Sequence, residues 1–212
     1  MVVLAAAILL GLAAPASADV NNFRFTSFDG QYSLGLDSAG RSMLSVVETL
    51  VAEFPQTDQN HGIRRELVET YDRHPTELAV TSVTDQYGRP RRFTTQTNGD
   101  FLDVTIRDDS FVYGSQTYVI RYTQHNVTRY FADTGADEFY WDTNGTGWAQ
   151  PFGSVTATVH LMPSLFSRHT GKADAASGGP GANGPATVTR TDDGYRFGAT
   201  NLAAGENLTF AI

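Results

Sequence analysis

The chain has 212 residues, with 15 lysines and arginines against 23 aspartates and glutamates, which gives a formal net charge of −8. A negative protein repels nucleic-acid phosphates, so nucleic-acid binding is not expected. The chain contains no cysteine, which excludes disulfides, thiol nucleophiles and thiolate metal sites.

The N-terminus has the pattern of a secretory signal. Residues 1–18 carry no charged side chain and end in the small residues Ala16-Ser17-Ala18, although the usual positively charged start is missing. The apolar run is shorter than the roughly 20 residues of a transmembrane helix. We therefore expect a cleaved signal peptide and an exported domain over residues 19–212. The alternative is a buried hydrophobic N-terminal helix.

The first half of this domain predicts β-structure. Two successive hairpins are expected, with strands over residues 23–26, 32–36 and 43–54 and turns at Asp29-Gly30 and at residues 37–40. The third strand is apolar on both faces, as in a central strand; one face carries Leu44, Val46, Glu48 and Leu50. A helix is the alternative for this segment, but its β-branched residues favour a strand.

The second half continues in the same way after a predicted loop over residues 55–65. Runs rich in Val, Thr, Tyr and Phe predict strands over residues 78–84, 91–95, 101–106, 117–123, 138–141, 155–161, 187–191, 195–197 and 208–212. Residues 171–186 are rich in Gly, Ala and Pro and predict a flexible loop near the C-terminal end. The predicted fold is an all-β antiparallel sandwich.

Four motifs carry a family resemblance, in chain order: LSVVETLVAEF, HGIRREL, YGSQTYVIRYTQ and DEFYWDTNGTGWAQPFGSV. They resemble the extracytoplasmic part of the bacterial membrane proteins of domain-of-unknown-function family 2207. The resemblance covers most of residues 25–161 and implies a signal peptide, a β-sandwich ectodomain and later transmembrane helices. The chain is therefore expected to be the N-terminal piece of a longer membrane protein.

Two of these motifs also depart from the family pattern. Arg65 matches the family arginine, whereas Arg64 stands where an aromatic residue is usual and Val68 where proline is usual. In the last motif, Asp142 replaces the more usual Asn. The resemblance implies architecture and location, but no activity.

The basic stretch His61-Gly62-Ile63-Arg64-Arg65 has two interpretations. Arginine forks suit a carboxylate or phosphate, and Gly62 allows close approach of an anion to the backbone. Alternatively, Arg65 pairs inside the protein with Glu138 or Asp137, while His61 bonds a loop carbonyl. We favour the structural interpretation, because an isolated basic motif in an acidic β-domain needs partners.

The last motif offers acids, a turn and aromatic rings. Asp137 and Glu138 point to opposite faces of a strand, which disfavours the paired carboxylates of a glycosidase. Residues 142–147 begin like a calcium loop, but the twelfth position, residue 153, is glycine instead of glutamate. A weaker calcium site stays an alternative to a turn that places Trp148 over the core. No zinc motif or nucleophile elbow occurs.

These features favour a non-catalytic extracytoplasmic domain of a bacterial envelope membrane protein that binds a protein or a cell-wall glycan. The candidate binding residues are His61, Arg64, Arg65, Glu138, Tyr140, Trp141 and Trp148. The aromatic members suit stacking on sugars, but at this density they are also typical of a core. The alternative is a carbohydrate-active envelope enzyme that uses Glu138 or Asp142. No cofactor or metal is predicted.

Overall fold

The computed structural model describes residues 19–212, so the predicted signal peptide lies outside the described residues. Strands make up 58% of the described residues, which include one short helix, α1 (Pro163–Phe166). The predicted all-β, sandwich-like fold is confirmed. Within the described residues no helix is long and apolar enough to cross a membrane.

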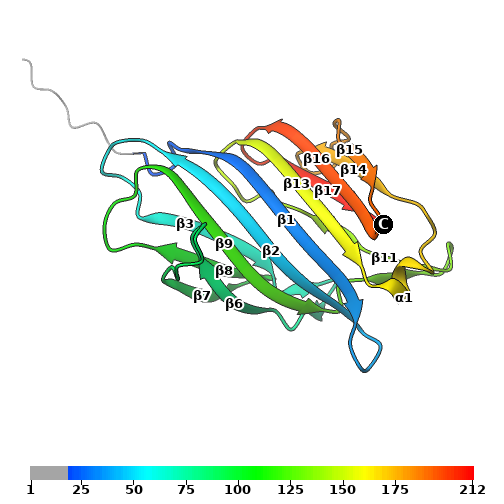
Figure 1. Cartoon of the computed structure of the whole chain (residues 1–212). Coiled ribbons are helices and arrows are strands. Elements are labelled where there is room, and N and C mark those ends of the chain that lie inside the picture. Colours follow the sequence, from blue (N-terminus) through cyan, green and yellow to red (C-terminus); the bar gives the residue numbers. More distant parts are fainter. Residues whose placement is uncertain (1–18) are drawn as a thin grey trace, which may run out of the picture.

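One layer is a seven-stranded sheet that curves across the whole molecule (Figure 1). In order across the sheet, the strands are β15 (Thr187–Arg190), β16 (Gly194–Leu202), β13 (Phe152–Leu161), β1 (Arg24–Leu36), β2 (Ser42–Phe54), β9 (Gly114–His125) and β6 (Ala79–Thr84). Neighbouring strands are antiparallel except for β1 and β13, which run parallel.

Two three-stranded sheets cover one face of the large sheet (Figure 1). The first has the order β3 (Gly62–Val68), β8 (Phe101–Arg107), β7 (Phe93–Asn98), and the second has the order β12 (Tyr140–Asp142), β17 (Asn207–Ala211), β14 (Asp174–Gly178). Two short ribbons complete the fold: β4 (Thr70–Tyr71) with β5 (His74–Pro75), and β10 (Arg129–Phe131) with β11 (Ala136–Glu138).

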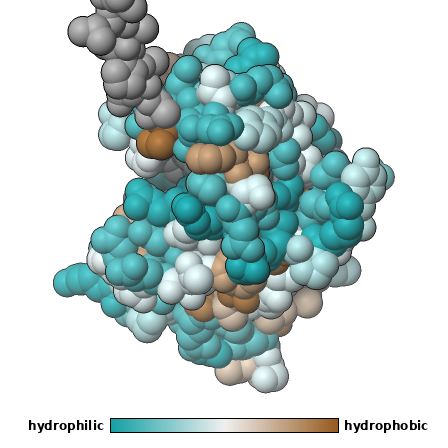
Figure 2. Space-filling model, turned by 90° about the vertical axis from the view of Figure 1, so that its left-hand side faces the viewer, coloured by the Kyte–Doolittle hydropathy of each residue, from teal (hydrophilic) through white to brown (hydrophobic). Residues whose placement is uncertain are grey.

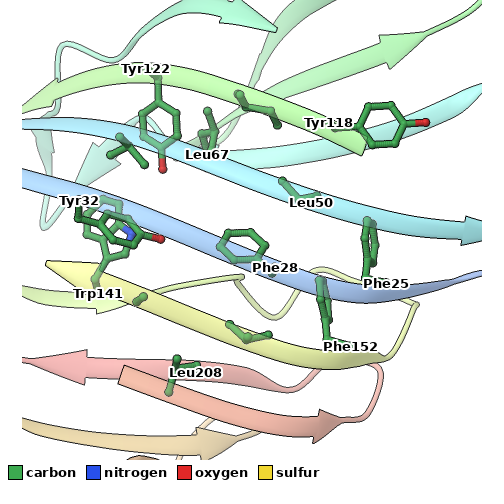
Figure 3. Close-up of a cluster of buried hydrophobic side chains, with 14 of the residues drawn as sticks. Phe25, Phe28, Tyr32, Leu50, Leu67, Tyr118, Tyr122, Trp141, Phe152 and Leu208 are labelled. Atoms are coloured by element: carbon green, nitrogen blue, oxygen red, sulfur yellow. The ribbon is translucent and has the colours of Figure 1, made fainter. Parts of the chain in front are cut away.

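The core lies between these layers and is rich in aromatic rings (Figure 3). Phe25 stacks on Phe152 with ring centroids 4.7 Å apart, which joins β1 to its parallel neighbour β13. Phe197 of β16 stacks on Phe210 of β17 at 4.6 Å, which fixes the second small sheet to the large one. A domain of this size buries enough apolar surface in such a core to be stable without disulfides.

The predicted turn at Asp29-Gly30 is wrong. β1 runs straight through these residues, and Gly30 pairs with Glu48 on one side. A Cβ atom at Gly30 would lie 2.5 Å from the ring of Tyr32, so the glycine makes room for an aromatic ring that lies across the strand. The following turn at residues 37–40 is confirmed, and the segment after it is a strand, not a helix.

Two other predicted loops are partly strands. The loop over residues 55–65 ends earlier than predicted, because β3 begins at Gly62 and pairs with β8. Within residues 171–186, β14 pairs with β17, and Ser177 bridges to Gly184. The small side chains of this segment bury little surface by themselves, but the edge of β17 supplies the hydrogen-bond partners that order them.

Candidate functional site

Arg65 lies at the centre of β3 and points toward the large sheet. Its Nε atom donates to Oε2 of Glu48 at 2.8 Å and its Nη2 atom to Oε1 at 2.7 Å, which is a two-pronged arginine–carboxylate pair. The side chains of Arg65 and Glu48 are 6% and 0% exposed. The pair therefore joins β3 to β2 through the interior of the sandwich.

The remaining groups around the pair are also occupied. Arg65 donates from Nη1 to the carbonyl of Asn144 at 2.7 Å and from Nη2 to the carbonyl of Thr143 at 3.0 Å. The Tyr122 hydroxyl donates to Oε1 of Glu48 at 2.8 Å. The guanidinium thus connects β2, β3 and the loop after β12, and four of its five N–H groups donate to atoms inside the protein.

The prediction that Arg65 pairs inside the protein is confirmed, but the predicted partner is wrong. Asp137 and Glu138 belong to β11, where Glu138 lies opposite Arg129 in the ribbon with β10. The true partner, Glu48, comes 17 residues before Arg65 in the chain. It lies on the inner face of β2, where an unpaired carboxylate would be costly.

Burial and charge act together on the pKa values of this cluster. Burial opposes the charge of Arg65, but the Glu48 carboxylate more than offsets it and the pKa of Arg65 is raised. Burial, reinforced by the negative charge of Glu48, raises the pKa of Tyr32 and of Tyr122 well above its usual value. The cluster is therefore a charged pair flanked by two neutral phenols.

The loop of residues 142–148 is held by Asn207 of β17. The Asn207 side-chain oxygen accepts from the backbone N–H groups of Asn144 at 3.2 Å and Gly145 at 3.1 Å. The Trp148 indole donates to the Asn144 carbonyl at 2.7 Å and its ring packs edge-on against Phe25. The interpretation of this loop as a turn that places Trp148 over the core is confirmed.

The acids of this region do not converge on a cleft. Oδ1 of Asp142 accepts from Asn207 at 2.8 Å and from the Thr209 hydroxyl at 2.7 Å. Across residues 19–212, no group of three or more His, Asp or Glu side chains is placed to hold a metal ion. Asp142 thus serves as an acceptor that fixes the loop to β17.

The aromatic candidates separate in the structure. Trp141 and Trp148 are buried in the core, whereas Tyr140 is 41% exposed on β12. The structure does not bring Tyr140 or Glu138 to the same site as His61 and Arg64. The seven candidate residues are thus partly core and partly surface, and they do not form one binding site.

A groove of about 620 Å³ does bring four candidates together beside β3. Its walls are the outer side of β3 and β8, the loop of residues 144–150 and the N-terminal residues 20–23. His61, Arg64 and Trp148 line it, and Arg65 closes its floor. Figure 2 shows the end of the molecule that lies on the left in Figure 1; hydrophilic side chains cover most of it, with small hydrophobic areas between them.

The N-terminal wall of the groove is fixed by side-chain amides. Asn60 donates to the carbonyl of Val20 at 2.7 Å, and Gln150 donates to the Asn21 side-chain oxygen at 3.2 Å. Both amide side chains are buried. Buried hydrogen bonds therefore hold one wall of the groove in place, and the first residues of the described chain form that wall.

The backbone of β3 is only half used by its neighbour. The backbone N–H of Asp108 donates to the His61 carbonyl at 2.8 Å, and the backbone N–H of Glu69 donates to the Asp100 carbonyl at 2.8 Å. In an antiparallel pair alternate residues are hydrogen-bonded, so the odd-numbered residues of β3 bond to β8. The N–H and C=O groups of the alternate residues, Gly62, Arg64 and Glu66, point away from β8. All three residues line the groove.

The groove is more basic than the rest of the protein. The Arg64 side chain is 58% exposed; its Nη2 atom lies 3.2 Å from Oε1 of Glu66 and its Nη1 atom 3.7 Å from Oδ2 of Asp103. Arg107 is exposed and lines the same groove, and His61 contacts the Asp108 carbonyl through Nδ1 at 3.1 Å. Among the lining residues, Glu66 is the single carboxylate. This part of a chain of charge −8 therefore suits neutral or negative ligands.

Sequence reasoning missed Glu48 and the strand character of β3, although both left a signal. Glu48 shares its face with the apolar Leu44 and Leu50, and an acid on such a face needs a buried base. Residues 63–67 alternate as Ile, Arg, Arg, Glu, Leu, which places Arg65 between two apolar side chains with period two. No sequence pattern near Asn207 indicated its role, because the loop that its side chain holds lies 62 residues earlier in the chain.

Comparison with solved structures shows the fold. Leukotriene A4 hydrolase from Saccharomyces cerevisiae matches with a TM-score of 0.53 at 13% identity, over 89% of this chain and 28% of the enzyme. The yeast enzyme in complex with bestatin matches with a TM-score of 0.52 at 13% identity, over 93% of this chain and 31% of that one. The chain thus spans less than a third of these enzymes, and it resembles their β-structured part in fold alone.

Sequence comparison gives the family. No curated protein sequence matches the chain. The family described as the predicted membrane protein (DUF2207) N-terminal domain matches residues 31–212, which is most of the chain and includes β2, β3 and the loop after β12. The chain therefore belongs to the DUF2207 family of predicted membrane proteins.

Proposed function

We propose that this domain is a non-catalytic, extracytoplasmic peptide-binding module of a bacterial envelope membrane protein. It holds an extended segment of a partner protein in the groove beside β3. The segment adds a strand to the sheet β3-β8-β7 by pairing with the free edge of β3. Membership of a family of predicted membrane proteins supports a location at the membrane.

The unpaired backbone in the groove carries this proposal. Gly62, Arg64 and Glu66 offer N–H and C=O groups at the spacing of a β-strand, and the groove gives an incoming chain a wall on its other side. Strand addition of this kind takes affinity from main-chain hydrogen bonds and specificity from pockets for alternate side chains. The cations Arg64 and Arg107 favour a neutral or acidic segment over a basic one.

The same groove gives less support to an enzyme or a sugar-binding site. A glycosidase needs two carboxylates about 5 to 10 Å apart in one cleft. Glu66 is the single carboxylate among the lining residues, and neither Glu138 nor Asp142 reaches the groove. A stacking platform for sugars needs exposed aromatic faces, whereas Trp141 and Trp148 are buried.

Selection from a library of displayed eight-residue peptides tests the proposal. Peptides that bind the parent should bind Arg64→Pro about tenfold more weakly, because proline removes a groove-facing N–H and spares the bonds to β8. Thr105→Trp, which fills the groove from β8, should also reduce binding. Val188→Pro is the matched control, since it removes an outward N–H from β15, the edge strand of the other layer.

Failure of the library to yield any binder would contradict the proposal. Equal binding to the parent, Arg64→Pro and Thr105→Trp would show that selected peptides bind elsewhere. Circular dichroism of each variant checks that it is folded before binding is measured.

A further inference from the structure

The sheet β3-β8-β7 has a second free edge, at β7, which lies outside the groove. The five residues from Thr94 to Asn98 are all exposed, on both faces of the strand. Natural proteins usually protect such an edge with charged residues, proline or a bulge. β7 has the sequence FTTQTN, which contains none of the charged residues and no proline, and its pairing with β8 is regular.

We propose that β7 pairs with β7 of a second copy of this chain, antiparallel about a two-fold axis at Gln96. The two three-stranded sheets then form one continuous six-stranded sheet. This proposal concerns the edge opposite β3, so it does not depend on the peptide-binding function of the groove.

The hydrogen bonding of the free edge fixes which registers are allowed. The Arg107 amide donates to the Arg92 carbonyl at 3.2 Å, so even-numbered residues of β7 bond to β8. The N–H and C=O groups of Thr95 and Thr97 therefore face outward. With the axis at Gln96, Thr95 of one copy lies opposite Thr97 of the other, and each such pair exchanges both of its backbone hydrogen bonds.

Charge at the two ends of β7 favours antiparallel over parallel pairing. Arg92 precedes β7, whereas Asp100 lies in the turn after it, where Asn98 pairs with Phe101. Antiparallel pairing brings Arg92 of each copy to the end of the partner strand that carries Asp100. A shift of the axis by one residue in either direction keeps the backbone bonds, so the centre at Gln96 rests on the side chains along the edge. In the free protein Arg92 contacts Asp109 at 2.8 Å between two exposed side chains, which is a weak pair to exchange.

The side chains along β7 are complementary to those of β7 in a second copy of the chain. Gln96 meets Gln96 on one face, where two amides can bond to each other, and Thr95 meets Thr97 on the other, a favourable cross-strand pair. The uncharged strand lets two copies approach although each chain carries a net charge of −8. Repulsion from that charge predicts that association strengthens as salt concentration rises.

Cysteine cross-linking tests the axis directly, because the chain has no cysteine of its own. Gln96→Cys should form a disulfide-linked dimer under mild oxidation, since residues opposite each other at a non-hydrogen-bonded position come within disulfide range. Thr94→Cys is the matched control on the same face of β7. In the proposed register, Thr94 lies opposite Asn98 and the two Thr94 residues are about 13 Å apart.

The expected result is rapid cross-linking of Gln96→Cys and little of Thr94→Cys, while an equimolar mixture of Thr94→Cys and Asn98→Cys gives a mixed dimer. Sedimentation equilibrium of the cysteine-free protein should show a monomer–dimer equilibrium that Thr95→Pro abolishes and the edge control Val188→Pro leaves unchanged. Equal cross-linking of Gln96→Cys and Thr94→Cys, or a monomer mass at every concentration up to about 1 mM, would overturn the proposal.

Discussion

Replacing Arg65 with alanine should destabilise the fold strongly without touching the surface. The change leaves the Glu48 carboxylate, which is 0% exposed, without its counter-ion. It also leaves the carbonyl of Thr143 without a donor and removes one of the two donors to the carbonyl of Asn144. Removing one partner of a buried ion pair costs about 3 to 5 kcal/mol. For a domain of this size that corresponds to a fall in Tm of about 6 to 20 °C.

Urea unfolding at neutral pH measures this effect, with Arg64→Ala as the neighbouring control. Arg64 is 58% exposed and its ion pairs are on the surface, so its loss should change the free energy of unfolding by less than about 0.5 kcal/mol. The double variant Glu48→Leu with Arg65→Met removes both charges and fills the space with apolar groups. It should be more stable than either Arg65→Ala or Glu48→Leu alone.

Two results would refute this reasoning. If Arg65→Ala and Arg64→Ala unfold at the same urea concentration, the pair does not tie the layers together. If the cost of the double variant equals the sum of the costs of Glu48→Leu and Arg65→Met measured singly, Glu48 and Arg65 do not interact in the folded protein.

Two further predictions follow from the glycine that starts β3 and from the buried phenols. Gly62 has a φ of +151°, and a Cβ atom there would lie 2.0 Å from the Ile106 carbonyl oxygen, whereas the space around Gly40 is open. In thermal melts, Gly62→Ala should therefore lower the free energy of unfolding by about 1 to 3 kcal/mol more than Gly40→Ala does. Because the pKa values of Tyr32 and Tyr122 are raised in the folded state, their contribution to stability is complete below the unfolded value of about 10 and is lost as the pH rises above it. Ultraviolet titration should show both phenols ionising together with unfolding, and smooth ionisation in a folded protein would contradict this.

The fold class was predictable because most strands show their period in the sequence. In β9 the alternate residues Tyr118, Ile120 and Tyr122 are buried on one face, and β2 is apolar enough on both faces to identify a central strand. Gly30 was misleading, because Asp-Gly is a common turn pair and the sequence does not reveal that the ring of Tyr32 lies over it. β14 was missed because its order comes from the edge of β17, a partner distant in sequence.

The site was predictable to a smaller extent. An arginine in an acidic β-domain predicts a carboxylate partner, and this held for Arg65. Which carboxylate it meets depends on how the small sheet lies on the large one, and that brings Glu48 of β2 to it instead of Glu138. The groove depends in addition on the N-terminal residues 20–23, whose position is set by Asn60 and Gln150 and has no local sequence signal.

Hydrogen exchange along β3, followed amide by amide with NMR, tests the central claim most directly. The account predicts an alternating pattern in the free protein, with the amides of Ile63, Arg65 and Leu67 protected by β8 and those of Arg64 and Glu66 exchanging quickly. A peptide bound in the groove should slow exchange at Arg64 and Glu66 and leave the other three unchanged. Uniform protection of all five amides in the free protein, or no change at Arg64 and Glu66 with peptide bound, would contradict a free β3 edge that receives a partner strand.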